Sequence, residues 1–145
     1  MMRREWWILG GLVGLALAIG PRMVAPVRGQ ITSRFRERGR PDHTGTDVAV
    51  PIGTPVVSPG AGSVAFSNYN DRGGHQVGIN LDNGLTVGLA HLNDRDVRPG
   101  ERVTKGQRVG LSGNTGNSTG PHVHVTVTNS QGERIDPETV FNLSA

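Results

Sequence analysis

The sequence contains no cysteine, few aromatic residues and, beyond residue 20, no long apolar run. Without cysteine, the chain can form neither a disulfide framework nor a thiolate zinc site, and it has no cysteine nucleophile. Any metal ion must therefore be held by histidine and carboxylate side chains. The length of 145 residues predicts one globular domain with a short extension.

Lysine is also scarce, because every basic residue except Lys105 is an arginine. The net charge of +3 gives the surface a weak attraction for polyanions. However, the densest basic cluster, residues 34–40, contains a glutamate and a single aromatic residue, whereas a surface that binds single-stranded nucleic acid interleaves several. We therefore expect no nucleic-acid partner.

The longest apolar segment, residues 6–20, follows two arginines near the amino terminus. As a helix it would span ~22 Å, which is shorter than a ~30 Å hydrocarbon core but within the range of a secretory signal. The triplet Ala16-Leu17-Ala18, with small residues at its first and third positions, offers a cleavage site, whereas the two tryptophans suit an uncleaved anchor. We predict that residues 1–21 are a signal peptide or membrane anchor, with membrane contact through residues 6–20 in the second case. The rest of the chain would be exported to the periplasm, cell envelope or exterior.

Residues 22–30 form a proline-containing linker, and we expect the folded domain to occupy residues 31–145. No sustained 3.6-residue apolar periodicity occurs in this domain, and its glycines and prolines separate short β-type runs. The prediction is an all-β fold, a compact antiparallel β-sheet domain preceded by one apolar N-terminal helix. The expected strands are residues 47–50, 54–57, 62–66, 76–81, 85–92, 103–105, 107–111 and 123–127.

One hairpin can be placed in register from its alternating apolar residues. A three-residue loop at 82–84, with Gly84 in the left-handed conformation, keeps both apolar sets on one face of the sheet. This register pairs Leu81 with Leu85, Ile79 with Val87, Val77 with Leu89 and, by extension, His75 with His91.

The first candidate metal-binding residues are His43 and Asp47. In a strand their Cα atoms would lie ~13 Å apart, which is too far for both side chains to bind one ion. The chain must therefore curl between them, and Gly45 makes a turn or bulge inexpensive there.

A second candidate pair is His122 and His124, whose side chains would point to the same face of a strand. His91 is in phase with the apolar residues of the hairpin and, taken alone, would be a core histidine. Together with Asp47, two or three of these histidines suit a four-coordinate zinc ion with one position left for water. Spacing alone leaves open which histidines bind the metal.

With these residues in this order, the sequence resembles a family, the lysostaphin-type zinc metalloendopeptidases of bacterial cell-wall metabolism. The resemblance covers about residues 27–141 and rests on the order and spacing of five stretches: residues 43–56, 89–92, 103–110, 113–124 and 136–137. It implies a compact β-sheet fold with a metal-containing groove for a peptide.

The resemblance also implies roles for individual residues. One zinc ion per chain would be bound by His43, Asp47 and His124, while His91 and His122 would be catalytic residues, one moving a proton and the other stabilising the oxyanion. Which of the two histidines has which role stays open. A metal-bound water would attack the amide carbonyl. Residues expected to support the site are His75, Asn117, Ser118 and Thr119.

Three features depart from the family pattern. Leu89 stands where the family usually has tyrosine, His75 where many members carry asparagine, and an arginine-rich loop covers residues 36–40. These departures affect substrate contacts rather than the metal.

We therefore predict a zinc-dependent endopeptidase that hydrolyses peptide cross-links of bacterial peptidoglycan. One alternative is a catalytically inactive module of the same fold that binds the cell wall or activates another hydrolase. A second alternative, a biotinyl or lipoyl carrier modified at Lys105, would leave four histidines without a role. The sequence does not distinguish a glycyl bond from a D-amino-acid cross-link as the target.

Overall fold

The computed structural model describes residues 22–145, so the predicted signal peptide or anchor and its apolar helix lie outside the described residues. The described part contains ten strands and one short 3₁₀ helix. The strands are β1 (Gln30–Ser33), β2 (Thr46–Ala49), β3 (Pro55–Val57), β4 (Gly62–Asn70), β5 (Gly74–Leu81), β6 (Thr86–Arg95), β7 (Arg102–Val103), β8 (Arg108–Ser112), β9 (Val123–Thr128) and β10 (Arg134–Ile135), and the helix is η1 (Pro137–Thr139).

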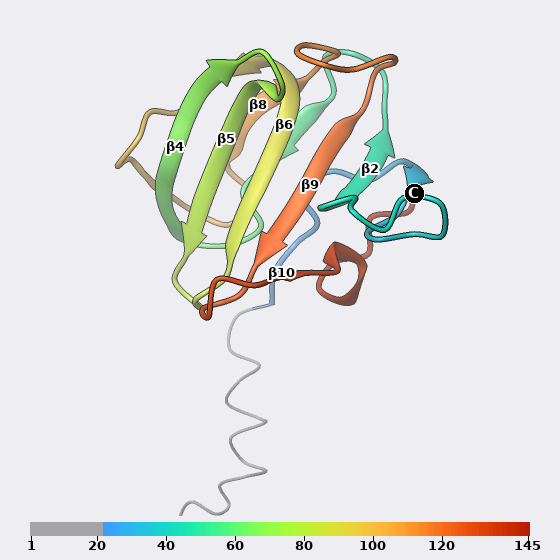
Figure 1. Cartoon of the computed structure of the whole chain (residues 1–145). Coiled ribbons are helices and arrows are strands. Elements are labelled where there is room, and N and C mark those ends of the chain that lie inside the picture. Colours follow the sequence, from blue (N-terminus) through green and yellow to red (C-terminus); the bar gives the residue numbers. More distant parts are fainter. Residues whose placement is uncertain (1–21) are drawn as a thin grey trace, which may run out of the picture.

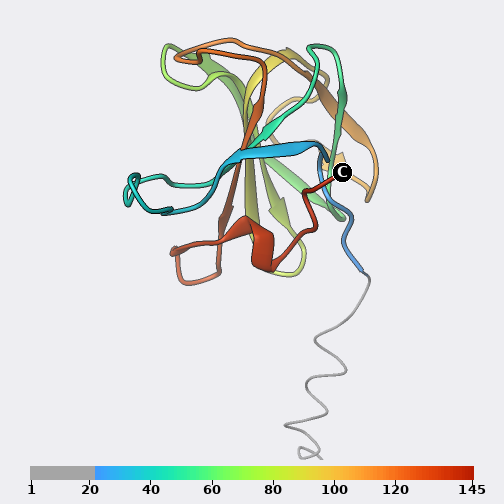
Figure 2. The same ribbon diagram turned by 90° about the vertical axis from the view of Figure 1, so that its right-hand side faces the viewer.

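All strand pairs are antiparallel, and they form one curved sheet with the order β1-β2-β9-β6-β5-β4-β7. Strand β10 pairs with the end of β9. Strand β8 pairs with the end of β6 and with β3, behind the main sheet (Figure 1). Seen from the side, the loops after β1, after β8 and after β9 project from the same face (Figure 2). The all-β prediction is confirmed, although β1, β10 and η1 were not expected.

The core lies on the other face of the sheet and is mainly valine, isoleucine and leucine. Alternation explains this arrangement, because every second residue of a strand points to the same side. On β6, for example, Val87 and Leu89 are buried in the core, while Gly88 and Ala90 face the opposite side. The outer face of β6 is thereby left with small side chains, and the Phe66 ring lies on the same face, over Gly78 of β5.

The β5–β6 hairpin confirms most of the predicted register. Ile79 pairs with Val87 and Val77 with Leu89, and Gly84 has a φ of 96° in the turn. The extension of this register is wrong, because a bulge places His75 opposite Leu92 instead of His91. An extra residue in β6 makes Leu92 a core residue and turns His91 to the outer face.

The predicted linker, residues 22–30, packs on the domain. Val27 is buried, the carbonyl of Pro26 accepts a hydrogen bond from Val57, and Gly29 bridges to Ser144. Within residues 22–145 no helix has the length and apolar character needed to cross a membrane.

Candidate metal centre

Three of the predicted ligands meet on the outer face where β2 and β9 run side by side. Asp47 and His124 are directly paired in the register, and His43 lies just before β2. The Asp47 carboxylate is 2.7 Å from Nδ1 of His124 and 3.2 Å from Nε2 of His43. One donor atom from each residue lies within 4.8 Å of the others. This is the group that the resemblance assigned to zinc.

The chain curls between His43 and Asp47, as their spacing required. The strand begins at Thr46, so His43 belongs to the preceding loop and folds back over the carboxylate. Gly45 lies against β9, and a Cβ atom there would be 2.1 Å from the carbonyl oxygen of Val125. Glycine is therefore needed at this position for the close approach of two backbones rather than for a turn.

The nitrogen atoms that face away from Asp47 also have partners. Nδ1 of His43 donates to the carbonyl of Arg34 at 2.8 Å, and Nε2 of His124 lies 3.1 Å from the hydroxyl of Thr44. Such outer contacts fix the orientation of metal-binding imidazoles and leave the inner nitrogen atoms available as ligands. Two imidazoles and one carboxylate are a donor set that fits zinc.

The charge of Asp47 is stabilised by its surroundings. Burial raises the pKa of this carboxyl, but the hydrogen bond from His124 and the neighbouring imidazoles outweigh that effect, so its pKa is below the usual value. The guanidinium group of Arg40 lies 3.7 Å from the same carboxylate. The carboxylate form that a metal ion requires is therefore the favoured one.

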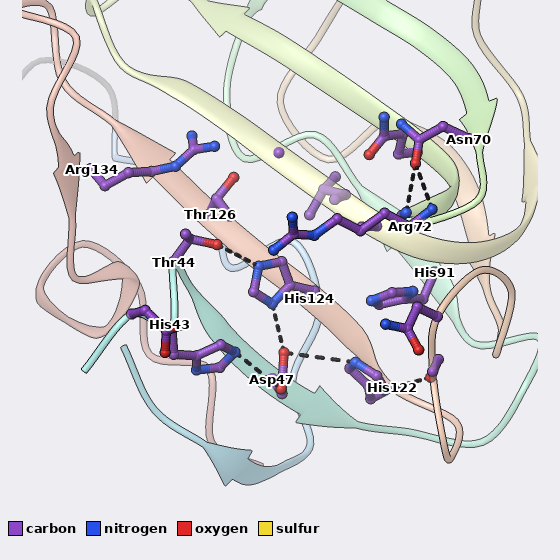
Figure 3. A pocket seen from close by; sticks show the side chains of 18 of the residues that line it. His43, Thr44, Asp47, Asn70, Arg72, His91, His122, His124, Thr126 and Arg134 are labelled. Carbon is purple, nitrogen blue, oxygen red and sulfur yellow. Dashed lines mark hydrogen bonds and ion pairs between the residues drawn. The ribbon is translucent and has the colours of Figure 1, made fainter. Parts of the chain in front are cut away.

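The two remaining predicted site histidines lie beside this group (Figure 3). The ring centroids of His91 and His122 are 4.7 Å apart, and Nε2 of His122 is 3.7 Å from Asp47. Their Nδ1 atoms donate to main-chain carbonyls at 2.8 Å, His91 to Thr115 and His122 to Gly120. Both imidazoles thus present Nε2 for contact with a substrate.

His91 has an unusual backbone conformation, with φ of 65° at a residue other than glycine. Such strain concentrates at functional sites, and here it accompanies the bulge that turns the side chain out of the core. Burial lowers the pKa of His91, and the nearby His122 and His124 lower it further against the opposing effect of the Thr115 carbonyl. The neutral imidazole, which can accept a proton, is favoured.

These residues lie in an open groove of about 830 Å³ across the outer face. Asn117, Ser118 and Thr119, which were expected to support the site, line one side of it. The hydroxyl of Ser118 lies 3.2 Å from Nδ1 of His122, and the main-chain N–H of Asn117 donates to Arg72. Their contacts hold the loop that carries His122.

The side chain of His75 lies away from the other site histidines. Its imidazole accepts a hydrogen bond from Arg95 and packs edge-on against Tyr69. Only its main chain approaches the site, through an N–H group that donates to the hydroxyl of Thr115, whose carbonyl holds His91. The side-chain contact with His91 that followed from the predicted register is absent.

Several residues of the site were not found by the sequence analysis. Arg34 and Thr115 act through main-chain carbonyls, which no side-chain pattern can reveal. Thr44 stands between His43 and Asp47 in the sequence, and its position next to His43 was the one available signal. Arg72, in the turn between β4 and β5, and Arg134, in β10, line the groove although they are far apart in the sequence.

The groove holds one carboxylate and two imidazoles at a single point, and two more imidazoles lie beside them. This arrangement defines a site of the metallohydrolase class. The sequence model of Peptidase family M23 matches residues 41–137, which include all five of these side chains. The chain belongs to this family.

Curated relatives agree with this assignment. The chain is similar to two peptidoglycan DD-endopeptidases of Vibrio cholerae: ShyC, with 42% identity over 104 residues, and ShyA, with 46% identity over 82 residues. These matches cover 72% and 57% of this chain but 22% and 19% of the relatives. The chain thus spans about a fifth of their length.

Solved structures share the fold. A zinc-containing peptidase from Vibrio cholerae superposes with a TM-score of 0.73 and 32% identity, covering 80% of this chain and 39% of the other. Lysostaphin from Staphylococcus simulans gives a TM-score of 0.73 with 26% identity, covering 83% and 53% respectively.

Proposed function

We propose that this chain is a zinc-dependent endopeptidase that hydrolyses peptide cross-links of bacterial peptidoglycan. The observation that carries the proposal is the complete donor group of His43, Asp47 and His124, with His91 and His122 beside it in an open groove. The names of the relatives support the substrate, since ShyC and ShyA are peptidoglycan DD-endopeptidases.

Zinc bound to this group would lower the pKa of a water ligand and polarise the scissile carbonyl. The chain's own residues supply the rest of the chemistry. His91, held neutral by burial, accepts a proton at Nε2 as the amide is attacked and returns it to the leaving amine. When it is protonated on both ring nitrogen atoms, His122 can keep its Nδ1 bond to the Gly120 carbonyl and donate a second hydrogen bond from Nε2 to the carbonyl oxygen of the substrate as negative charge develops there.

A peptidoglycan substrate places the enzyme in the cell envelope or outside the cell. In this proposal residues 1–21 direct or anchor the chain, residues 22–30 connect this segment to the sheet, and residues 31–145 form the catalytic domain with one zinc ion. Membrane contact, if the anchor is retained, is made through residues 6–20.

Digestion of purified sacculi tests the proposed function. Sacculi of several wall types are incubated with the zinc-loaded chain, and the released muropeptides are identified by mass analysis. We expect cross-linked dimers to decrease and their monomers to increase. Binding to sacculi without release of any fragment would contradict the proposal and favour the inactive cell-wall-binding or hydrolase-activating module.

A further inference from the structure

The groove beside the metal centre carries positive charge that the site itself does not use. Three arginines line it, Arg40, Arg72 and Arg134, and Arg40 lies close to the carboxylate of Asp47. Among residues 22–145, no ion pair includes Arg72 or Arg134. Two guanidinium groups therefore line the groove with no carboxylate of this part of the chain within ion-pair distance, although the side chain of Asp42 lines the same groove.

The backbone of Arg72 is fixed by contacts on both sides. The side chain of Asn70 accepts hydrogen bonds from the N–H groups of Arg72, at 3.0 Å, and Gly73, at 2.7 Å. The carbonyl of Arg72 accepts a third bond from Asn117 in the opposite loop. A Cβ atom at Gly116 would lie 2.8 Å from this carbonyl, so the two loops are in close contact. The Arg72 side chain thus extends from an anchored turn.

Arg134 is held on the other side of the groove. It lies in β10, where it pairs with Thr128 of β9, and its Nη1 donates to the Thr128 hydroxyl at 2.6 Å. In Figure 3 the Arg72 and Arg134 side chains enter from opposite sides above the strand that carries Thr126 and His124. The two guanidinium groups therefore flank the approach to the metal centre.

Part of the groove lining on β6 and β9 has short side chains. Gly88, Ala90 and Thr126 line the groove there, and a Cβ atom at Gly88 would lie 2.4 Å from the hydroxyl of Thr126. These short side chains leave room for an extended peptide next to the guanidinium groups. Guanidinium groups bind carboxylates through paired N–H donors, and the anionic groups of a peptide are carboxylates.

We propose that Arg72 and Arg134 form a subsite for a carboxylate of the substrate, so that the enzyme favours cross-links with a free carboxylate near the scissile bond over neutral, glycine-rich cross-links. This inference rests on the proposed function. It assigns the two arginines to substrate selection and leaves the chemistry to the metal centre and its two histidines.

Two synthetic cross-linked peptides test the inference, identical except that one has a free carboxylate next to the scissile bond and the other a carboxamide. We expect the native chain to cleave the carboxylate peptide with the higher kcat/KM, mainly through a lower KM. In Arg72→Met and Arg134→Met the preference should fall roughly tenfold for each lost charged hydrogen-bonding group. Arg98→Met is the matched control, because Arg98 is exposed and does not line the groove.

Equal cleavage of both peptides by the native chain would overturn the inference while leaving the proposed function intact, as would an unchanged preference in both arginine variants. If neither peptide is cleaved, the proposed function fails, and calorimetry on the zinc-loaded chain decides about the subsite. Tighter binding of the carboxylate peptide that is lost in Arg72→Met and Arg134→Met would support it. Equal binding of the two peptides would contradict it.

Discussion

At the scale of single residues, each histidine of the site is held in one orientation by a contact of one ring nitrogen atom, which leaves the other nitrogen atom facing Asp47 or the groove. His43 and His124 use their outer nitrogen atoms for the Arg34 carbonyl and the Thr44 hydroxyl, whereas His91 and His122 use Nδ1 for main-chain carbonyls. The four imidazoles therefore divide into two that face Asp47, which we propose as metal ligands, and two that face the groove, which we propose as catalytic groups.

This division predicts different losses for His124→Ala and His91→Ala. The first variant should lose both zinc and hydrolysis, because it lacks a ligand. The second should keep zinc but lose roughly 10²–10⁴-fold in rate, the usual contribution of a general base. Elemental analysis of protein without an affinity tag, together with the rate of muropeptide release, separates the two outcomes. Loss of zinc from His91→Ala would contradict the division.

His75 provides a matched control within the same residue type. Because its imidazole contacts Arg95 and Tyr69, His75→Ala should keep zinc, the hydrolysis rate and the pH–rate profile. A displaced limb of the profile would show instead that His75 acts on His91 through Thr115, the route by which the main chains are connected.

At the scale of elements, the strands follow from the sequence more fully than the bulge does. The alternating residues of β5 and β6 predicted the shared apolar face and the pairing of Ile79 with Val87. The same alternation placed His91 in the core, since a bulge interrupts the period and leaves no regular pattern behind. A polar residue in phase with an apolar face, as at His91, was the one signal of it.

The contact between β2 and β9 leads to a prediction for Gly45. Gly45→Ala would force these strands apart, because the added Cβ atom meets the carbonyl of Val125 at 2.1 Å. We expect the free energy of unfolding, measured in urea, to fall by about 1–3 kcal/mol, as at other overpacked sites. Zinc affinity should also fall, because Asp47 moves away from His124.

Gly60→Ala is the matched control for this change. A Cβ atom there would make ordinary contacts of 3.8 Å with Leu81 and Met23, so stability should change by less than about 0.5 kcal/mol. Equal stability and zinc content in both variants would show that the approach of β2 to β9 does not depend on glycine.

The edge strand β7 is joined to the β5–β6 turn by a pair of hydrogen bonds from Arg102 to Asp82. This contact lowers the pKa of Asp82, so it stabilises the fold above the unfolded-state pKa of ~3.9 and stops doing so as pH falls through the lower folded-state value. Arg102→Met should therefore lower the urea midpoint slightly at neutral pH, and this difference should vanish in strong acid. A difference that persists there would assign the effect to packing.

At the scale of the whole molecule, the site is assembled from segments that are distant in the sequence. The histidine and aspartate motifs predicted a metal-binding group because the resemblance implied their roles, and the structure brings His43, Asp47 and His124 together. The resemblance implied the groove, but its arginines could not be predicted. The position of Arg72 depends on how the β4–β5 turn packs against the β8–β9 loop, and that of Arg134 depends on the pairing of β10 with β9.

Zinc should also stabilise the whole fold, because it would connect β9 to β2 and to the loop before β2. His124 lies in β9, Asp47 in β2 and His43 in that loop. At a zinc concentration about 100-fold above Kd, the expected gain is about 2.7 kcal/mol. Differential scanning calorimetry should therefore show a Tm lower by roughly 5–20 °C in excess chelator. His124→Ala should have the same Tm with and without chelator, and a chelator-sensitive Tm in that variant would place the ion elsewhere.

A zinc titration of the metal-free chain tests whether hydrolysis depends on one zinc ion held by His43, Asp47 and His124. Muropeptide release from sacculi is measured after each addition of zinc. The rate should rise from the background in proportion to added zinc and reach its maximum at about one ion per chain. Full hydrolysis by the metal-free chain, or no hydrolysis at any zinc content, would contradict this dependence.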